Sequence, residues 1–335
     1  MVGLLVAAVL PFGLVACGGN EGSSEEDSTL TVYSGREEEL VEPLLERFEE
    51  ESGVELEVRY GDSAELAATI VEEGENSPAD VFFSQDAGAL GALQDEELLA
   101  ELPEEILSSV DPSFHSAEGR WVGTSGRARV VAYNTEALSP ADLPDSVLDY
   151  TAEEWKGRVG WAPTNSSFQA FVTAMRITEG EEVARDWVRG MVDNQAETFA
   201  DNEAIRDAVA SGEIDVGLLN HYYVAQAREE EGADYPVEVS FPEGGDVGSL
   251  VNVAGIGVLG SSDSPDSGSE LAEFLLSDAS QEFFANETKE YPLVEGVDAD
   301  PLVVPLEQIE HPDVDLSNLD DLQGTLRLIQ EAGAL

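Results

Sequence analysis

Apolar and polar positions alternate in two rhythms along the chain from Thr29 onward. Residues 37–51 repeat apolar side chains every three or four positions, which predicts an amphipathic helix. Residues 54–60 (VELEVRY) alternate apolar and polar positions, as a half-buried strand does. Further strands are predicted over 30–33, 80–84, 128–133, 158–162, 214–219, 237–241 and 250–259, and helices over 63–73, 86–99, 167–178, 181–193, 203–211, 221–231, 268–277 and 279–287. This regular alternation indicates an α/β fold built mainly from parallel sheet.

The N-terminal segment looks like an export signal. Residues 2–16 form an apolar run that is too short to span a bilayer as a helix, and it ends in LVA before Cys17, as a lipobox does. We therefore predict a signal peptide over 1–16, lipidation of Cys17 and a polar tether over 17–28. Residues 1–16 lack the Lys or Arg that usually opens a signal peptide, which a misplaced start codon would explain. The alternative is a buried N-terminal element with a chance cysteine.

The charge balance changes the picture of the surface. The 335 residues include 71 acidic and 15 basic ones, for a net charge of −56, yet the 42% apolar content is normal for a folded protein. The length suggests two domains. Such a charge argues against binding nucleic acid or an anionic membrane, because both require basic patches. Only high ionic strength screens this self-repulsion well, so we expect a halophilic protein that works in brine.

Several enzyme signatures can be excluded or discounted. With Cys17 as the one cysteine, no disulfide can form within the chain and no Cys-rich zinc site can exist. Residues 255–260 match the dinucleotide fingerprint formally, but a polar loop follows them where that fingerprint requires a helix. The sequence has no Walker A motif and no nucleophile elbow, and its three histidines lie far apart. We therefore expect a binding protein rather than an enzyme.

Two adjacent tyrosines are the outstanding candidates for chemistry. Tyr222 and Tyr223 follow the predicted strand 214–219 and open the next helix, at the sheet edge where open α/β folds bind ligands. Two phenolates are hard oxygen donors that suit ferric iron, and a trivalent ion would lower their pKa values enough for them to bind it at neutral pH. The residues alone leave an alternative open, in which one ring packs in the core and the other at its rim.

Six segments together resemble the periplasmic ferric-ion-binding proteins, the substrate-binding components of iron ABC importers. The segments are LTVYSGREEELVEPL (30–44), SPADVFFSQDAGAL (77–90), SGRARVVAYNT (125–135), WKGRVGWAPTNSSFQAFV (155–172), GEIDVGLLNHYYVA (212–225) and EYPLVEGV (290–297). The resemblance implies a type II periplasmic-binding-protein fold, in which hinge strands join two α/β lobes. The expected lobes are 29–128 plus 254–303, and 129–253 plus 304–335.

The resemblance also implies a ligand set for Fe(III). The tandem tyrosine ligands of the family fall on Tyr222 and Tyr223, and a position that is often histidine falls on Glu37. A position that is glutamate in some members falls on Gln85, with Asp86 beside it as the candidate donor. Glu37 could instead be solvated charge favoured by the dipole of a helix N-terminus.

A synergistic anion, phosphate or carbonate, is expected beside the metal. The residues aligned with its site are Arg127, Asn165, Ser166, Ser167, Asn202 and Asn220. Several of these positions have an alternative interpretation. Arg127 and Arg129 could pair with surface acids, and Asn165, Ser166 and Asn202 could be no more than helix caps.

The function that the resemblance implies is capture and delivery. We expect a monomeric lipoprotein on the outer face of the cytoplasmic membrane that binds ferric iron and passes it to an ABC transporter permease. The alternative is a protein of the same fold for an organic solute such as thiamine, a polyamine or a phosphonate. A hydrolase with an acidic pair is the remaining and least favoured reading.

Overall fold

Nine strands form one continuous twisted sheet in the computed structural model, which describes residues 29–335. The predicted signal peptide, Cys17 and the tether lie outside the described residues. The strand order is β2-β1-β3-β9-β4-β7-β5-β6, with β8 also paired to β4. The strands are β1 (Thr29–Ser34), β2 (Glu55–Tyr60), β3 (Val81–Ser84), β4 (Val122–Asn134), β5 (Val159–Trp161), β6 (Glu197–Thr198), β7 (Val216–Asn220), β8 (Val237–Ser240) and β9 (Val251–Val258).

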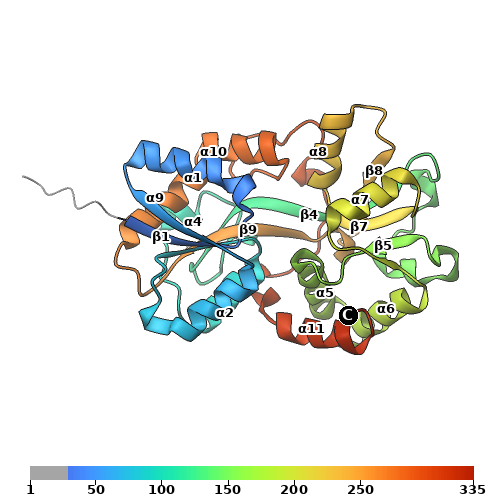
Figure 1. Cartoon of the computed structure of the whole chain (residues 1–335), viewed down its shortest axis with the longest axis horizontal. Coiled ribbons are helices and arrows are strands. Elements are labelled where there is room, and N and C mark those ends of the chain that lie inside the picture. Colours follow the sequence, from blue (N-terminus) through green and yellow to red (C-terminus); the bar gives the residue numbers. More distant parts are fainter. Residues whose placement is uncertain (1–28) are drawn as a thin grey trace, which may run out of the picture.

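Two long strands connect the halves of the molecule (Figure 1). Along 122–128, β4 pairs antiparallel with β9, and along 129–134 it pairs antiparallel with β7 and β8. We call the part built on β1, β2 and β3 the first half, and the part built on β5, β6, β7 and β8 the second half. β1 runs parallel to β2 and β3, so their carboxyl ends meet at one edge.

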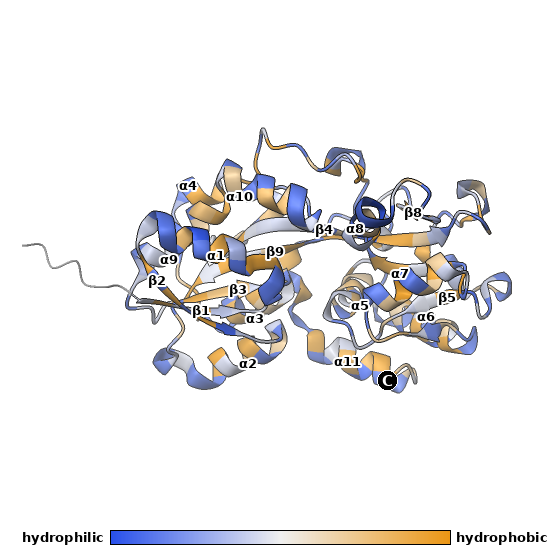
Figure 2. Ribbon diagram, turned by 45° about the horizontal axis from the view of Figure 1, so that its top comes forward, coloured by the Kyte–Doolittle hydropathy of each residue, from blue (hydrophilic) through white to orange (hydrophobic). Residues whose placement is uncertain are grey.

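Helices cover both faces of the sheet, with apolar positions turned inward and polar positions outward (Figure 2). The first half carries α1 (Glu38–Ser52), α2 (Ser63–Glu73), α3 (Ala87–Asp95), α4 (Glu104–Leu107), α9 (Pro265–Leu275) and α10 (Asp278–Phe283). The second half carries α5 (Ser166–Thr178), α6 (Glu181–Asp193), α7 (Asn202–Ser211), α8 (Tyr222–Glu231) and α11 (Leu322–Glu331). The predicted α/β class is confirmed, but the expectation of mainly parallel sheet is wrong, because β9 pairs antiparallel with β3 and with β4, and β4 pairs antiparallel with β7 and β8. None of the helices in the described part of the chain is long and apolar enough to cross a bilayer.

The C-terminal segment contacts both halves, which differs from the expected placement of 304–335 in the second lobe alone. The turn Leu316–Asp320 packs against α3 so closely that a Cβ on Gly91 would lie 2.1 Å from the carbonyl oxygen of Ser317. α11 packs against α5 and α6, with Thr325 Oγ1 2.7 Å from Thr173 Oγ1. The close approach depends on a glycine without a side chain, which the hydrophobic pattern does not reveal.

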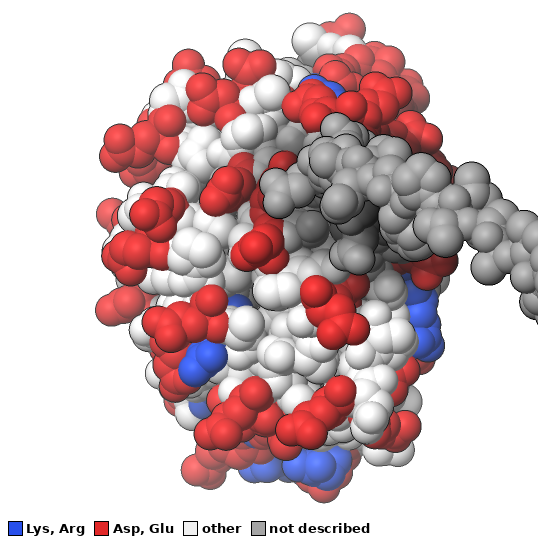
Figure 3. Space-filling view, turned by 90° about the vertical axis from the view of Figure 1, so that its left-hand side faces the viewer, with Lys and Arg blue, Asp and Glu red and all other residues white. Residues whose placement is uncertain are grey.

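The surface is as acidic as the composition predicts. On the face shown in Figure 3, Asp and Glu side chains cover much of the first half and Lys or Arg side chains are few. The buried interior is different, because Arg36, Arg127 and Arg129 are each at most 4% exposed. With Lys289, which is 1% exposed, four of the scarce cations therefore lie inside the protein.

Candidate functional site

A cleft of about 530 Å³ lies between the two halves. The loops that follow β1, β2 and β3 line it from the first half. The end of β7, the turn before α5 and the starts of α5, α7 and α8 line it from the second half. The lining residues are Gly35, Arg36, Glu37, Glu38, Glu39, Tyr60, Gly61, Asp62, Ser63 and Gln85 from the first half, and Asn165, Ser166, Ser167, Asn202, Asn220, Tyr222 and Tyr223 from the second.

The two tyrosines lie together on the wall of the second half, because β7 ends at Asn220 and α8 begins at Tyr222. Their ring centroids are 4.3 Å apart. Burial raises the pKa of both phenols, and the nearby guanidinium of Arg127 opposes that rise. Both phenols are therefore neutral at pH 7 by themselves, and a bound trivalent cation would supply the field that ionises them.

His221 fixes the turn that presents the tyrosines. Its backbone N–H donates to the carbonyl of Ala128, its ring Nδ1 accepts the N–H of Ala128 at 3.2 Å, and Nε2 lies 2.9 Å from the carbonyl oxygen of Lys289. The ring stacks on Tyr291 at a centroid distance of 4.3 Å. Burial lowers the pKa of His221 to about 4, so the ring is neutral and holds the turn without adding charge.

Of the two predicted metal ligands of the first half, one lines the cleft and the other does not. Glu37 is exposed, lines the cleft and is close enough to Tyr223 to affect its pKa. Asp86 is 3% exposed, is absent from the cleft lining and caps α3 by accepting the N–H of Ala89 at 3.1 Å. Burial raises the pKa of Asp86 against the opposing charge of Arg127. Gln85 does line the cleft, but its side-chain oxygen accepts from Arg36 Nη1 at 2.8 Å.

Five of the six predicted anion-binding residues come together on the wall of the second half: Asn165, Ser166, Ser167, Asn202 and Asn220. Asn165 also caps α5, since its Oδ1 accepts the N–H of Ser167 at 3.1 Å, so capping and cleft lining coexist there. The cap of α7 is Asp201, which makes the reading of Asn202 as a helix cap wrong by one residue.

The two arginines are buried rather than paired with surface acids, so that alternative is wrong. Arg129 donates to the Asn220 side-chain oxygen at 3.2 Å and to the carbonyl of Leu218 at 2.9 Å, which joins β4 to β7. Arg127 is 2% exposed and does not line the cleft, and none of its three guanidinium nitrogens has a hydrogen-bond partner among residues 29–335. Its nearest carboxylate is that of Glu290, 3.9 Å from Nε.

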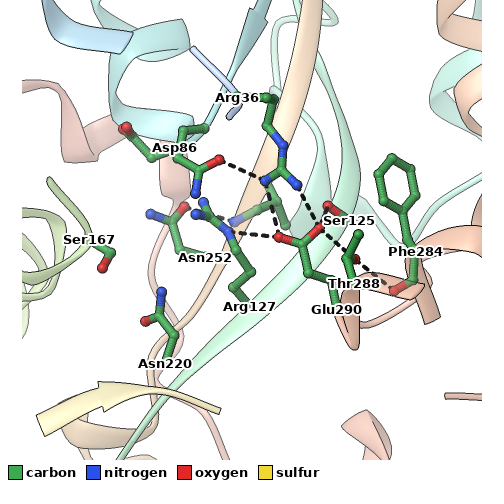
Figure 4. A network of polar contacts seen from close by, with 12 residues as sticks. Arg36, Asp86, Ser125, Arg127, Ser167, Asn220, Asn252, Phe284, Thr288 and Glu290 are labelled. Atoms are coloured by element: carbon green, nitrogen blue, oxygen red, sulfur yellow. Dashed lines mark hydrogen bonds and ion pairs between the residues drawn. The ribbon is translucent and has the colours of Figure 1, made fainter. Parts of the chain in front are cut away.

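Glu290 joins the buried cations behind the cleft (Figure 4). Arg36 contacts both of its oxygens, with Nη1 at 3.1 Å from Oε1 and Nη2 at 2.8 Å from Oε2, and Ser125 Oγ donates to Oε2 at 2.8 Å. Burial favours the protonated form, but the charges of Arg36 and Arg127 prevail and hold the pKa of Glu290 below its usual range. Sequence analysis missed Glu290 and His221. Each lies within a segment that carries the family resemblance, but its contacts are to residues far away in the chain.

Comparison with known proteins identifies the family of the chain. The sequence model of the family described as bacterial extracellular solute-binding protein matches residues 44–310. The chain is 31% identical to the "Fe(3+)-binding periplasmic protein" of Serratia marcescens, with 100% of this chain and 97% of that protein covered. It is 34% identical to the "Major ferric iron-binding protein" of Neisseria meningitidis serogroup B, with 91% and 92% covered.

The structural likeness is equally extensive. Iron-bound HitA from Pseudomonas aeruginosa superposes with a TM-score of 0.85 at 32% identity, over 91% of this chain and 99% of that one. These likenesses confirm the resemblance to ferric-ion-binding proteins and the type II periplasmic-binding-protein fold.

Proposed function

Because the chain belongs to the family of bacterial extracellular solute-binding proteins, we propose that it binds ferric iron in the cleft together with a small anion. The observation that carries the proposal is the pair of phenol groups, Tyr222 and Tyr223, facing the carboxylate of Glu37 across the cleft. Phenolate and carboxylate oxygens are hard donors, and hard donors suit a hard trivalent cation. The role is capture and release, with no covalent step and therefore no enzymatic activity.

The wall of the second half supports the anion. Ser166, Ser167, Asn202 and Asn220 offer hydroxyl and amide donors at the start of α5 and beside it, where a helix N-terminus favours negative charge. Arg127 lies behind this wall, and its positive charge opposes the rise that burial causes in the pKa of Tyr222 and of Tyr223. Phosphate and carbonate both have the size and charge for this place.

The halves are proposed to close over the ligand as two lobes about the strands β4 and β9, with residues 29–128 and 254–303 in the first lobe, residues 129–253 in the second, and the segment 304–335 divided between them. The turn Leu316–Asp320 moves with the first half because it packs on α3, and α11 moves with the second. Closure brings Glu37 toward the phenols, so that each half contributes ligands.

Export and anchoring complete the proposal. We infer that cleavage leaves Cys17 as the lipidated first residue, that the tether holds a monomer on the outer face of the cytoplasmic membrane, and that an ABC transporter permease receives the iron. Replacing Cys17 with serine should release the protein from the membrane fraction into the medium, whereas an unchanged membrane fraction would contradict the anchor.

Titration of the apo-protein with ferric nitrilotriacetate tests the binding proposal. A phenolate-to-iron charge-transfer band should appear in the visible spectrum and saturate at one iron per chain. The band should be lost in the double variant Tyr222→Phe/Tyr223→Phe and kept in Tyr235→Phe, a half-buried tyrosine of the second half outside the cleft. A colourless protein that instead binds thiamine, spermidine or a phosphonate would establish the organic-solute alternative.

Iron titrations without phosphate and carbonate test the proposed anion site. Iron affinity should fall when phosphate and carbonate are removed, and restoring either of them singly should identify the one that binds. The variant Arg127→Gln should weaken this anion dependence and move the band, because the phenolates lose a neighbouring positive charge. Equal iron affinity with and without both anions would refute the anion site.

A further inference from the structure

The turn after β3, where a carboxylate ligand was expected, offers no free carboxylate to the cleft. Asp86 is buried and occupied as the cap of α3, and the side-chain oxygen of Gln85 accepts from Arg36. After these two are set aside, the loops that follow β1 and β2 must supply the anionic donors of this wall. Glu37 stands at the first of these loops and Asp62 at the second.

Asp62 is held in place by its own helix. Its Oδ1 accepts the N–H groups of Ala64 at 2.9 Å and Glu65 at 3.2 Å, which makes it the N-cap of α2. Within the described part of the chain, no hydrogen bond or ion pair uses its other oxygen, and the residue is exposed and lines the cleft. One oxygen therefore orients the carboxylate and the second is free to bind a cation.

The loop around Asp62 is also fixed to its neighbours. Ser63 Oγ accepts the N–H of Gln85 at 2.9 Å, and a Cβ on Gly35 would lie 2.0 Å from that same oxygen. The turns after β1, β2 and β3 thus meet at Ser63, next to Asp62. Asp62 therefore lines the cleft next to the contact that holds the turn of Gln85, whose own side-chain oxygen accepts from Arg36.

Charge completes the argument. Asp62 is near enough to Asp86 that its negative charge raises the pKa of that buried carboxyl. The one cation in the cleft lining, Arg36, is already bound to Glu290 and Gln85. A multivalent cation between Asp62 and the phenols would balance a charge that no residue from 29 to 335 neutralises by an ion pair.

We propose that Asp62 supplies a carboxylate ligand to the ferric ion from the first half, with Glu37 beside it and Tyr222 and Tyr223 opposite. This assignment rests on the proposed function and adds a ligand to it. Asp86, by contrast, stabilises α3 and does not touch the ion.

The test uses variants that separate ligation from capping. Asp62→Asn and Asp62→Ser both retain an N-cap, because Asn and Ser cap helices about as well as Asp. The control Glu65→Gln removes one negative charge from the first turn of α2 at an exposed residue outside the cleft lining. All are prepared as full chains, and apo melting temperatures within about 2 °C of that of Glu65→Gln show that the fold is kept.

Two readouts follow from ligation. Ferric affinity, measured by competition with citrate, should fall at least about tenfold in both Asp62 variants, the lower end of what loss of even a supporting partner costs a metal site. The charge-transfer band should remain but move to longer wavelength, because iron that has lost an anionic donor accepts an electron more easily. Glu65→Gln should change neither.

The outcomes distinguish this inference from the function on which it rests. A wild-type band with Asp62 variants that match Glu65→Gln in affinity and in band position would overturn the ligand role of Asp62 and leave iron binding intact. Absence of the band from the wild-type protein would overturn both. A weakened and shifted band in Asp62→Asn and Asp62→Ser alone supports the assignment.

Discussion

Replacing Glu290 with glutamine should destabilise the protein more than any change of an exposed acidic residue. Glu290 and the Arg36 guanidinium are at most 1% exposed, and Arg127 lies 3.9 Å away on the other side. Glutamine keeps the shape and one acceptor but leaves two buried guanidiniums without a counter-charge. Removing one partner of a buried pair typically costs about 3–5 kcal/mol, so we expect a loss of at least about 3 kcal/mol in the free energy of unfolding.

Urea unfolding in multimolar KCl measures this loss with little contribution from repulsion between the exposed acidic side chains. The salt screens exposed charges, whereas the buried pair is screened much less, so the difference should persist there. Glu287→Gln is the matched control, because Glu287 is exposed and lies three residues away in the same segment. It should change the free energy of unfolding by no more than about 0.5 kcal/mol.

The pH dependence gives an independent check. The folded protein holds the pKa of Glu290 below the ordinary 4.5, so its stabilising contribution is complete above that ordinary value. The contribution is lost as the pH falls through the depressed folded-state pKa, and the gap between wild type and Glu290→Gln should close there. A gap under about 1 kcal/mol at pH 7, or one that does not narrow at acid pH, would contradict a stabilising role for the ionised Glu290.

Three further changes have expected outcomes. Lys289→Met should lower the free energy of unfolding by about 3 kcal/mol, because it leaves the buried carboxylate of Asp300 without its partner. Lys156→Met, at an exposed site, should cost at most about 1 kcal/mol. Urea unfolding compares the two variants, and equal losses would contradict this expectation. Gly91→Ala should cost about 1–3 kcal/mol in the same assay, since the new Cβ would lie 2.1 Å from the carbonyl oxygen of Ser317, and a neutral result would mean that the turn is not held. The melting temperature should rise from low salt to multimolar KCl, and a melt that ignores salt would refute the dominance of surface repulsion.

The strands and helices could be predicted because each leaves a local period in the sequence. One departure shows a turn that the period does not reveal. The helix expected over 86–99 ends at Asp95, since Glu97 takes a positive φ of 57° and Leu99 turns back to bridge Leu259. The apolar spacing continues through this point and gives no sign of the turn.

Some residues of the candidate site could likewise be predicted from the sequence, and others could not. Tyr222 and Tyr223 could be identified as candidates because they are adjacent in sequence at the end of a predicted strand. The family resemblance indicated Glu37 and the polar residues of the second half as further candidates. The pairing of Arg36 with Glu290 spans 254 residues, and no local pattern connects them. Asp86 looked like a ligand because it lies beside Gln85, and only the structure reveals that its carboxylate is turned to cap α3.

The separation of charge between surface and interior predicts that stability and iron binding respond differently to salt. The acidic groups on the outside repel one another over distances that multimolar salt screens to about 3 Å, so the melting temperature should depend strongly on KCl. The cleft groups act at contact distances, with Arg127 and Arg129 buried behind them, and salt weakens such short and shielded interactions far less. Ferric affinity, measured against citrate only at salt concentrations where the melt shows a folded protein, should therefore change by less than about tenfold while the melting temperature changes by many degrees. A steep fall of affinity with salt would mean that long-range attraction by the acidic surface, and not the cleft, holds the ion.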